Sequence, residues 1–206
     1  IAFTVMCIGV LLLPLPRGIQ FAMLVLIYNI SLPLLAIRFK QSDWLDIWSF
    51  LLPLSIFQVF PDWFLSAQLK TLVFPADGLF KIGTVSAYMA LLWVIPLFLV
   101  VFTAEKVKLH VHPLVAYPAA GMVGVLIFGT SEATLWRLGS WHAQNVEMLG
   151  HIALYVIPAE FILSVLAYAG YKGTQKSPLP IKILTAFCVM LAYSGALNFF
   201  YFFLET

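Results

Sequence analysis

Residues 131–161 read SEATLWRLGSWHAQNVEMLGHIALYVIPAEF, and this stretch decides how the chain is interpreted. It opens with a polar segment that contains Glu132 and continues into an apolar run that carries a second acid, Glu160. Apolar runs surround the stretch on both sides, so each ionisable group in it needs a physical reason to be tolerated. A fainter version of the same layout occurs at residues 61–93.

The composition is that of a membrane protein. Of the 206 residues, 63% are hydrophobic and 10% are charged, and the mean hydropathy is +1.01, which lies outside the range of soluble domains. Apolar runs recur with short gaps, and about 20 apolar residues are enough to cross a bilayer. We therefore expect an all-α, polytopic membrane helical bundle of about seven transmembrane helices, forming a single domain over residues 1–206. The expected spans are 1–16, 18–37, 44–60, 84–103, 113–131, 149–169 and 181–203.

The basic residues fall unevenly on the two sides of such a bundle. The larger set comprises Arg38, Lys40, Lys106, Lys108, Lys172, Lys176 and Lys182, and the smaller set Arg17, Lys70, Lys81 and Arg137. Basic loops favour the cytoplasmic side, so we expect the larger set there, or on the stromal side in a plastid. The expected location is a bacterial inner membrane or a plastid (thylakoid) membrane. The opposite side then receives Asp62, Asp77, Glu132, His142 and Glu147.

The two polar stretches have the layout of an internal repeat. In the second copy, Glu132 closes one span, Leu149-Gly150 opens the next, and Tyr155 follows the glycine by five residues. In the first copy, Asp62, Ile82-Gly83 and Tyr88 stand in the corresponding places, and Trp93 corresponds to Glu160. Copies that start on the same side and run the same way predict parallel repeats, residues 61–103 and 131–169, whose polar loops converge over one cavity. Chance similarity between apolar helices is the alternative.

Glu160 is the first candidate for chemistry. It lies about halfway along its expected span, where an ionised carboxylate costs at least ~2.5 kcal/mol, so a neutral carboxyl that can donate a proton is favoured. The alternative is a neutral glutamic acid that hydrogen-bonds a carbonyl freed near Pro158. Glu132 and Asp62 are further catalytic candidates; for Glu132, a helix-end carboxylate in the headgroup layer is the alternative.

Aromatic and histidine residues near these acids are candidates for lining a ligand pocket. Trp141 and His142 also suit an interfacial anchor, and Glu147 and His151, spaced i,i+4, suit a salt bridge or helix cap. Close approach of the fifth span to a neighbour is expected from the small residues Ala119, Ala120, Gly121 and Gly124. The expected pocket residues are Trp93, Trp136, Trp141, His142, His151, Tyr88 and Tyr155.

The sequence lacks the residues that several known membrane-protein activities require. No lysine lies deep in the last span for a retinal Schiff base, and four scattered histidines cannot form a histidine-box metal centre. Nucleophile-elbow and Gly-rich phosphate motifs are missing. After these exclusions, a hydrophobic ligand is the remaining expectation. The expected partners are membrane lipid, a hydrophobic small molecule and other membrane subunits. We expect no nucleic acid, no metal and no required cofactor.

The layout of residues 131–161 resembles the repeat of the small integral-membrane lycopene cyclases, the heterodimeric bacterial and fused fungal or archaeal type. That repeat has an acid closing one helix, a short loop with Trp, a Leu-Gly entering the next helix, and then Pro-x-Glu-Glu. The corresponding residues here are Glu132, Trp141, Leu149-Gly150 and Pro158-Ala159-Glu160. The second acid of the motif is Phe161 in this chain, and Trp93 stands where the first copy would have an acid.

Two functions follow as expectations. The resemblance implies a lipophilic pocket in which acid groups protonate the end of a polyene, so the first is acid-catalysed transformation of an isoprenoid or carotenoid. Glu160 would be the acid, and Glu132 or Asp62 would stabilise positive charge together with Trp and Tyr faces. The alternative is a non-catalytic subunit that binds pigment or lipid, such as carotenoid or chlorophyll, or assembles a larger membrane complex such as a photosynthetic one.

Overall fold

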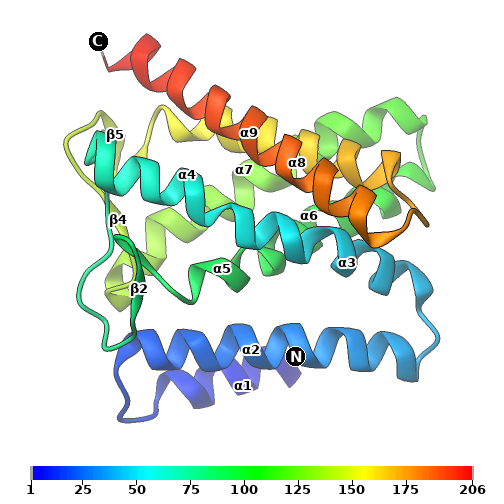
Figure 1. Ribbon diagram of the computed structural model, residues 1–206, viewed down its shortest axis with the longest axis horizontal. Helices are drawn as coiled ribbons and strands as arrows, with labels where there is room; N and C mark the ends of the chain where they lie inside the picture. The colour runs from blue at the N-terminus through cyan, green and yellow to red at the C-terminus, as the bar shows by residue number, and fades with distance from the viewer. Residues whose placement is uncertain (1, 206) are drawn as a thin grey trace.

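Helices make up most of the protein in the computed structural model, which describes residues 2–205 (Figure 1). Helices satisfy their own backbone hydrogen bonds, which apolar surroundings require. The α-helices are α1 (Ala2–Leu11), α2 (Arg17–Arg38), α3 (Ser42–Phe57), α4 (Val59–Trp63), α5 (Met89–Leu92), α6 (Val94–Lys108), α7 (Ala116–Leu135), α8 (Val156–Gly173) and α9 (Leu179–Leu204). Shorter helical turns are the π-helical Phe64–Leu69 and the 3₁₀ segments Pro113–Val115 and Trp136–Leu138.

Within residues 2–205, five helical segments are long and apolar enough to cross a membrane. They are Arg17–Arg38, Ser42–Leu69, Met89–Lys108, Pro113–Leu138 and Leu179–Leu204. The expectation of about seven spans is therefore not confirmed. In the expected span 1–16, α1 has ten residues, about 15 Å of helix. In the expected span 149–169, residues 149–155 form a hairpin and a turn, and the helix α8 begins at Val156.

Prolines explain where two long helices break and why a third does not. Pro61 and Pro96 lack the N–H that would bond the carbonyl four residues earlier, and the regular α-helix is interrupted three residues before each, at Gln58 and at Trp93. Pro158 is the third residue of α8, where a backbone N–H has no partner within the helix. Pro158 therefore frees no carbonyl within α8, and the alternative in which Glu160 hydrogen-bonds such a carbonyl loses its basis.

Short strands gather at one end of the bundle, which we call the hairpin end (left in Figure 1). Two hairpins turn at Gly83 and Gly150, whose φ values of +63° and +67° suit glycine. The first hairpin pairs β2 (Lys81–Ile82) with β3 (Val85–Ser86), and the second pairs β5 (Met148–Leu149) with β6 (Ile152–Ala153). Between them, β1 (Leu72–Val73) pairs antiparallel with β4 (His142–Ala143) to form what we call the β ribbon. The same order of elements thus occurs twice: a helix, a shorter helical turn, a ribbon strand, a hairpin and a helix.

The helices α7 and α8 pack closely because α7 presents glycines to α8. A Cβ atom at Gly121 would meet the ring of Phe161, and one at Gly124 would meet the side chain of Ser164. The prediction that small residues bring this helix close to a neighbour is confirmed at these two positions. The contact fixes α8 against α7, and these helices carry Glu160 and Glu132.

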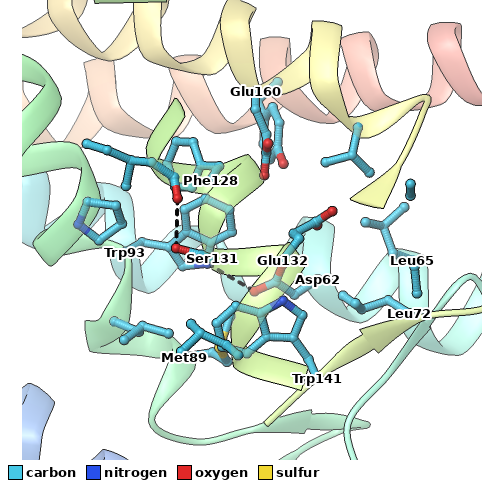
Figure 2. A pocket seen from close by; sticks show the side chains of 18 of the residues that line it. Asp62, Leu65, Leu72, Met89, Trp93, Phe128, Ser131, Glu132, Trp141 and Glu160 are labelled. Atoms are coloured by element: carbon cyan, nitrogen blue, oxygen red, sulfur yellow. Dashed lines mark hydrogen bonds between the residues drawn. The ribbon is translucent and has the colours of Figure 1, made fainter. Parts of the chain in front are cut away.

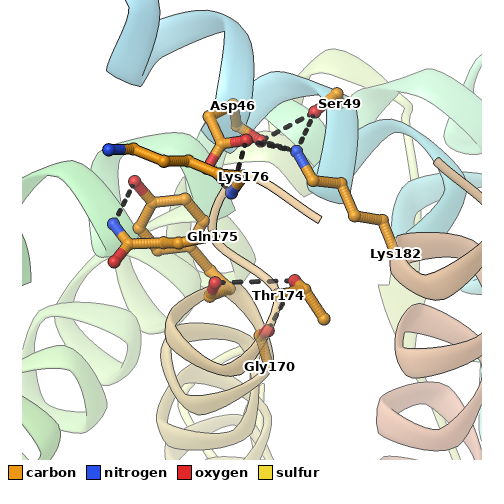
Figure 3. A network of polar contacts seen from close by, with 8 residues as sticks. Asp46, Ser49, Gly170, Thr174, Gln175, Lys176 and Lys182 are labelled. Atoms are coloured by element: carbon orange, nitrogen blue, oxygen red, sulfur yellow. Dashed lines mark hydrogen bonds and ion pairs between the residues drawn. The ribbon is translucent and has the colours of Figure 1, made fainter. Parts of the chain in front are cut away.

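The opposite end, which we call the basic end, is fastened by ion pairs. Lys182 of α9 is buried and bonds the carboxylate of Asp46 and the hydroxyl of Ser49 on α3 (Figure 3). The same carboxylate accepts the backbone N–H of Lys176 in the loop between α8 and α9. A second pair joins Lys172 of α8 to Glu105 of α6 at 3.2 Å. Three basic residues of the larger set, Lys172, Lys176 and Lys182, therefore take part in contacts at this end. The side of the membrane that the set faces stays a prediction.

Candidate functional site

Three carboxyl groups line one cavity near the hairpin end (Figure 2). Asp62 comes from α4, Glu132 from α7 and Glu160 from α8. The cavity has a volume of about 220 Å³, and its other walls are mainly apolar and aromatic side chains. Residues far apart in the sequence thus meet at one site.

Asp62 has a hydrogen-bond donor inside the cavity. The indole Nε1–H of Trp93 donates to Asp62 Oδ2 at 3.1 Å, and both side chains are buried (Figure 2). Trp93 is placed there by the break between α5 and α6, which the missing N–H of Pro96 explains. A donor at this distance stabilises a carboxylate that is removed from water.

Glu132 and Glu160 each keep a buried oxygen without a partner. The Oε2 atom of each is buried and accepts no hydrogen bond from any residue within 2–205. Glu160 is 3% exposed, so its carboxyl group lies away from the protein surface. An unpaired buried oxygen is costly, and such groups concentrate where a protein uses them.

The charges of the site are uncompensated. None of the described residues that line the cavity is a lysine, arginine or histidine. Ionising all three carboxyl groups there would place like charges in apolar surroundings without a cation. The arrangement therefore suits a proton held among the acids and released to a bound molecule.

The hairpin end covers the cavity. Thr71 and Trp141 flank the β ribbon, and both line the cavity together with Tyr155, at the start of α8. The hydroxyl groups of Thr71 and Tyr155 are hydrogen-bonded at 2.9 Å, which ties the first polar stretch to the second. This cover depends on pairing between residues about 70 apart in the chain.

Some expected pocket residues line the cavity and others lie outside it. Trp93, Trp141 and Tyr155 line it with the three acids. Tyr88 does not: it is buried against Phe21. Trp136, His142 and His151 also lie outside the lining.

Residues 147–151 do not form the expected helical pair. His151 lies in the turn between β5 and β6 and stacks on Trp136, with 3.9 Å between ring centroids. Glu147 precedes β5, and its backbone N–H bonds the carboxylate of Glu205. His142 is exposed on β4, opposite Val73. The i,i+4 interpretation was wrong because this apolar segment turns at Gly150 instead of continuing as a helix.

Asp77, expected on the same side as the acids, has a structural role. Its carboxylate accepts the backbone N–H of Leu79 at 2.9 Å and the hydroxyl of Ser86 at 2.6 Å. Its own carbonyl accepts the N–H of Gly18 at 2.8 Å, at the start of α2. Asp77 therefore holds its loop against α2 and does not line the cavity.

Sequence reasoning missed Tyr193 and Thr71. Tyr193 lies midway along α9, is 2% exposed and packs edge-on against Trp93 at 6.3 Å between ring centroids. A tyrosine in the middle of an apolar span was a usable signal, because its hydroxyl needs a polar neighbour there. Thr71 gave no such signal, since its role depends on the ribbon.

The donor set does not form a metal site in the part of the chain that the structure describes. Within residues 2–205, no group of three or more His, Cys, Asp or Glu side chains is arranged to hold a metal ion. The acids of the cavity face apolar and aromatic neighbours instead.

Fold and site together define a multi-pass helical membrane protein with a buried acidic cavity. The chain belongs to the family described as Domain of unknown function (DUF6989), whose model matches residues 59–204. The matched range contains every residue that lines the cavity, from Asp62 to Tyr193, whereas α1, α2 and α3 lie outside it. No curated protein and no solved structure matches the chain. The family description assigns no activity, so function rests on the cavity.

Proposed function

We propose that the protein is a membrane enzyme that transfers a proton to the apolar end of an isoprenoid-type molecule, with Glu160 as the proton donor. One observation carries the proposal: three carboxyl groups from three helices meet in one apolar cavity, and none of the described residues that line it is a cation. A purely structural acid inside a membrane bundle is expected to be paired with a donor or a base. Glu160 Oε2 has neither among the residues that the structure describes.

The roles of the acids differ because their surroundings differ. Asp62 accepts the Trp93 hydrogen bond, and a donated N–H stabilises a carboxylate, so we assign Asp62 the role of stabilising positive charge. Glu132 and Glu160 have free oxygens that can hold and deliver a proton. Proton transfer from Glu160 to a carbon–carbon double bond leaves a carbocation and the Glu160 carboxylate. Return of a proton from a neighbouring carbon to that carboxylate gives a neutral product with a new double bond and restores the acid.

Aromatic walls suit that cation. The rings of Trp93, Trp141, Phe128, Tyr155 and Tyr193 all line the cavity. An aromatic face attracts a cation electrostatically, more strongly where water is excluded. These rings also keep water from trapping a reactive intermediate.

We also propose that the two polar stretches are copies of one parallel repeat, residues 61–103 and 131–169, and that α8 spans the membrane as well. Support comes from the matching hairpins at Gly83 and Gly150 and from the ribbon that joins the copies. In this repeat Asp62 corresponds to Glu132 and Trp93 to Glu160, and all four line the cavity. With 18 residues, α8 is about 27 Å long, close to the ~30 Å of a hydrocarbon core.

The resemblance to membrane lycopene cyclases supports an isoprenoid substrate, in a bacterial inner membrane or a plastid membrane. The second acid of their motif is absent here, but the residue at that position, Phe161, does not line the cavity. Phe161 packs against Gly121 of α7 instead. A proton donor at Glu160 is therefore compatible with phenylalanine at the next position.

A non-catalytic subunit that binds pigment or lipid is the second candidate. It is favoured by the aromatic residues Phe199 and Phe203, which stack on each other and are 62% and 71% exposed on α9. Such a pair suits a contact with another membrane subunit. In that case a carotenoid or chlorophyll would be held without turnover.

Glu160→Gln tests the proposal against this alternative. The protein is expressed in bacteria that accumulate linear carotenes, and extracted pigments are separated and identified by mass spectrometry. Loss of a general acid typically costs about 10²–10⁴ in rate, so we expect Glu160→Gln to abolish product while its membrane level stays normal. Glu147→Gln is the control, because Glu147 is exposed and lies outside the cavity. Unchanged product from Glu160→Gln, or a pigment that co-purifies with no product, would contradict the enzymatic proposal.

A further inference from the structure

We infer that the cavity is entered sideways from the bilayer, between α6 and α7 near Leu99, so that its ligand is a long, membrane-dissolved molecule of which one end fits inside. The inference rests on the proposed function and names the class of substrate that the same cavity takes. It is carried by three features of the cavity: its cover, its exposed edge and its volume.

The cover closes the route from water. Beside the β ribbon, the backbone N–H of Gln144 donates to the carbonyl of Thr71 at 2.9 Å, and its side-chain amide donates to the carbonyl of Lys70 at 3.1 Å. The Thr71–Tyr155 hydrogen bond adds a third tie on the cavity side. Opening this end would break several hydrogen bonds between the two polar stretches, which makes entry from water unfavourable.

The edge formed by α6 and α7 is apolar and reaches the surface. Leu99 of α6 is 46% exposed, and every other lining residue is buried or half-buried. Beside Leu99, the half-buried lining residues Ile95 and Pro96 share its helix, and Ile127 lies on α7. Apolar side chains at such an edge can change rotamer without losing a hydrogen bond, on the nanosecond timescale of exposed side chains. This side therefore opens far more easily than the ribbon.

The volume limits what can be enclosed. At about 220 Å³, the cavity is smaller than the ~300–1,000 Å³ of sites that bury a whole drug-sized ligand. A long hydrocarbon must leave most of its length outside. An exit at Leu99 places that remainder among lipid chains, where it costs nothing to keep.

Two carbodiimides that differ in solubility test the entrance. Both add to a protonated carboxyl group to give an O-acylisourea, which rearranges to a stable N-acylurea where water is excluded and is trapped as an amide by added glycine ethyl ester where water enters. Mass spectrometry of the digested protein therefore reads access to Glu132 and Glu160 for either reagent. Protein in phosphatidylcholine vesicles is treated either with dicyclohexylcarbodiimide, which dissolves in the bilayer, or with a water-soluble carbodiimide. We expect the first reagent to modify Glu132 or Glu160 and the second to leave both unmodified.

A variant at the edge then locates the entrance. Leu99→Trp fills the opening and should slow modification by about tenfold, as an added barrier of ~1.4 kcal/mol would. Leu126→Trp is the matched control, because Leu126 is 66% exposed on α7 but does not line the cavity. Even if Leu99→Trp misfolds, the comparison of the two reagents on the unsubstituted protein shows whether the cavity is reached from the bilayer or from water.

Three results would overturn the inference: equal modification by both reagents, no modification by either, or an unchanged rate in a correctly folded Leu99→Trp protein. Each can be told apart from failure of the proposed function. If the carboxyl groups react through the bilayer but Glu160→Gln is fully active, the lateral entrance is supported and the enzymatic role of Glu160 is rejected. If Glu160→Gln is inactive but the carboxyl groups react from water, the enzymatic role is supported and the lateral entrance is rejected.

Discussion

Replacing Gly124 with alanine tests whether the close approach of α7 and α8 holds the cavity together. A Cβ atom at this position would lie 1.8 Å from Ser164 Oγ and 2.6 Å from Ser164 Cβ. Non-bonded carbon atoms sit best at about 3.5–4.0 Å, so even with the hydroxyl turned aside the helices must move apart by roughly 1 Å. A gap of that size forfeits about a quarter to a half of the dispersion energy of each contact across the interface.

The expected cost follows from two opposing effects. Overpacking costs about 1–3 kcal/mol, while replacing glycine by alanine in a helix gains up to about 1 kcal/mol. Gly129→Ala on the same helix isolates the gain, because its nearest neighbour, Ile152 Cδ1, would lie at 3.8 Å, an ordinary contact distance. We expect Gly124→Ala to have a free energy of unfolding lower than that of Gly129→Ala by about 1–3 kcal/mol.

The assay is unfolding of the detergent-solubilised protein by sodium dodecyl sulfate, followed by circular dichroism. Ser164→Gly, alone and combined with Gly124→Ala, completes a double-mutant cycle, since the pair moves the small residue from α7 to α8. The second substitution should recover most of the loss, with a coupling energy of about 1–3 kcal/mol. If Gly124→Ala is as stable as Gly129→Ala, or if Ser164→Gly does not restore stability to Gly124→Ala, the close approach of α7 and α8 at Gly124 does not stabilise the protein.

Two further predictions use the same unfolding assay. Trp93→Phe keeps a ring in the cavity but removes the N–H that Asp62 accepts, so we expect a loss of about 1–3 kcal/mol; a neutral result would remove the hydrogen bond from the argument. Gly83→Ala and Gly150→Ala both force alanine into a left-handed backbone, at a cost of about 1–2 kcal/mol each. Gly83→Ala should lower the free energy of unfolding more than Gly150→Ala, because a Cβ atom at Gly83 would lie 2.7 Å from the Trp63 ring while Gly150 has open space. Equal losses of stability would show that the Trp63 ring moves aside freely.

The features that could be predicted from the sequence are those set by composition and short-range spacing. Apolar runs identify the membrane helices, because a lipid environment leaves few other ways to satisfy the backbone. The acid Glu160 stands out in such a run without knowledge of its neighbours, and it does line the cavity. The glycines at 121 and 124 likewise mark a close helix contact by their spacing alone.

The features that could not be predicted depend on contacts across the chain. No local sequence pattern predicts the pairing of Leu72 with Ala143, because a strand of two residues is too short to show an alternation of its own. The apolar segment around Gly150 has the hydropathy of a helix, yet it forms a hairpin once Gly150 takes a positive φ. For the same reason His151, expected to face the pocket, turns outward and stacks on Trp136.

The proposed repeat gives a physical reason for the asymmetry of the cavity. Two copies with identical acids would bring four carboxyl groups into one apolar space, and each added charge would raise the cost of the others. At the position of Glu160, the first copy has Trp93, which removes one charge and donates a hydrogen bond to Asp62 at 3.1 Å. The second copy keeps Glu132 and Glu160, each with a buried oxygen that no donor from the described part of the chain satisfies. One half of the cavity is therefore suited to holding a stabilised carboxylate, and the other half to holding a proton that can leave.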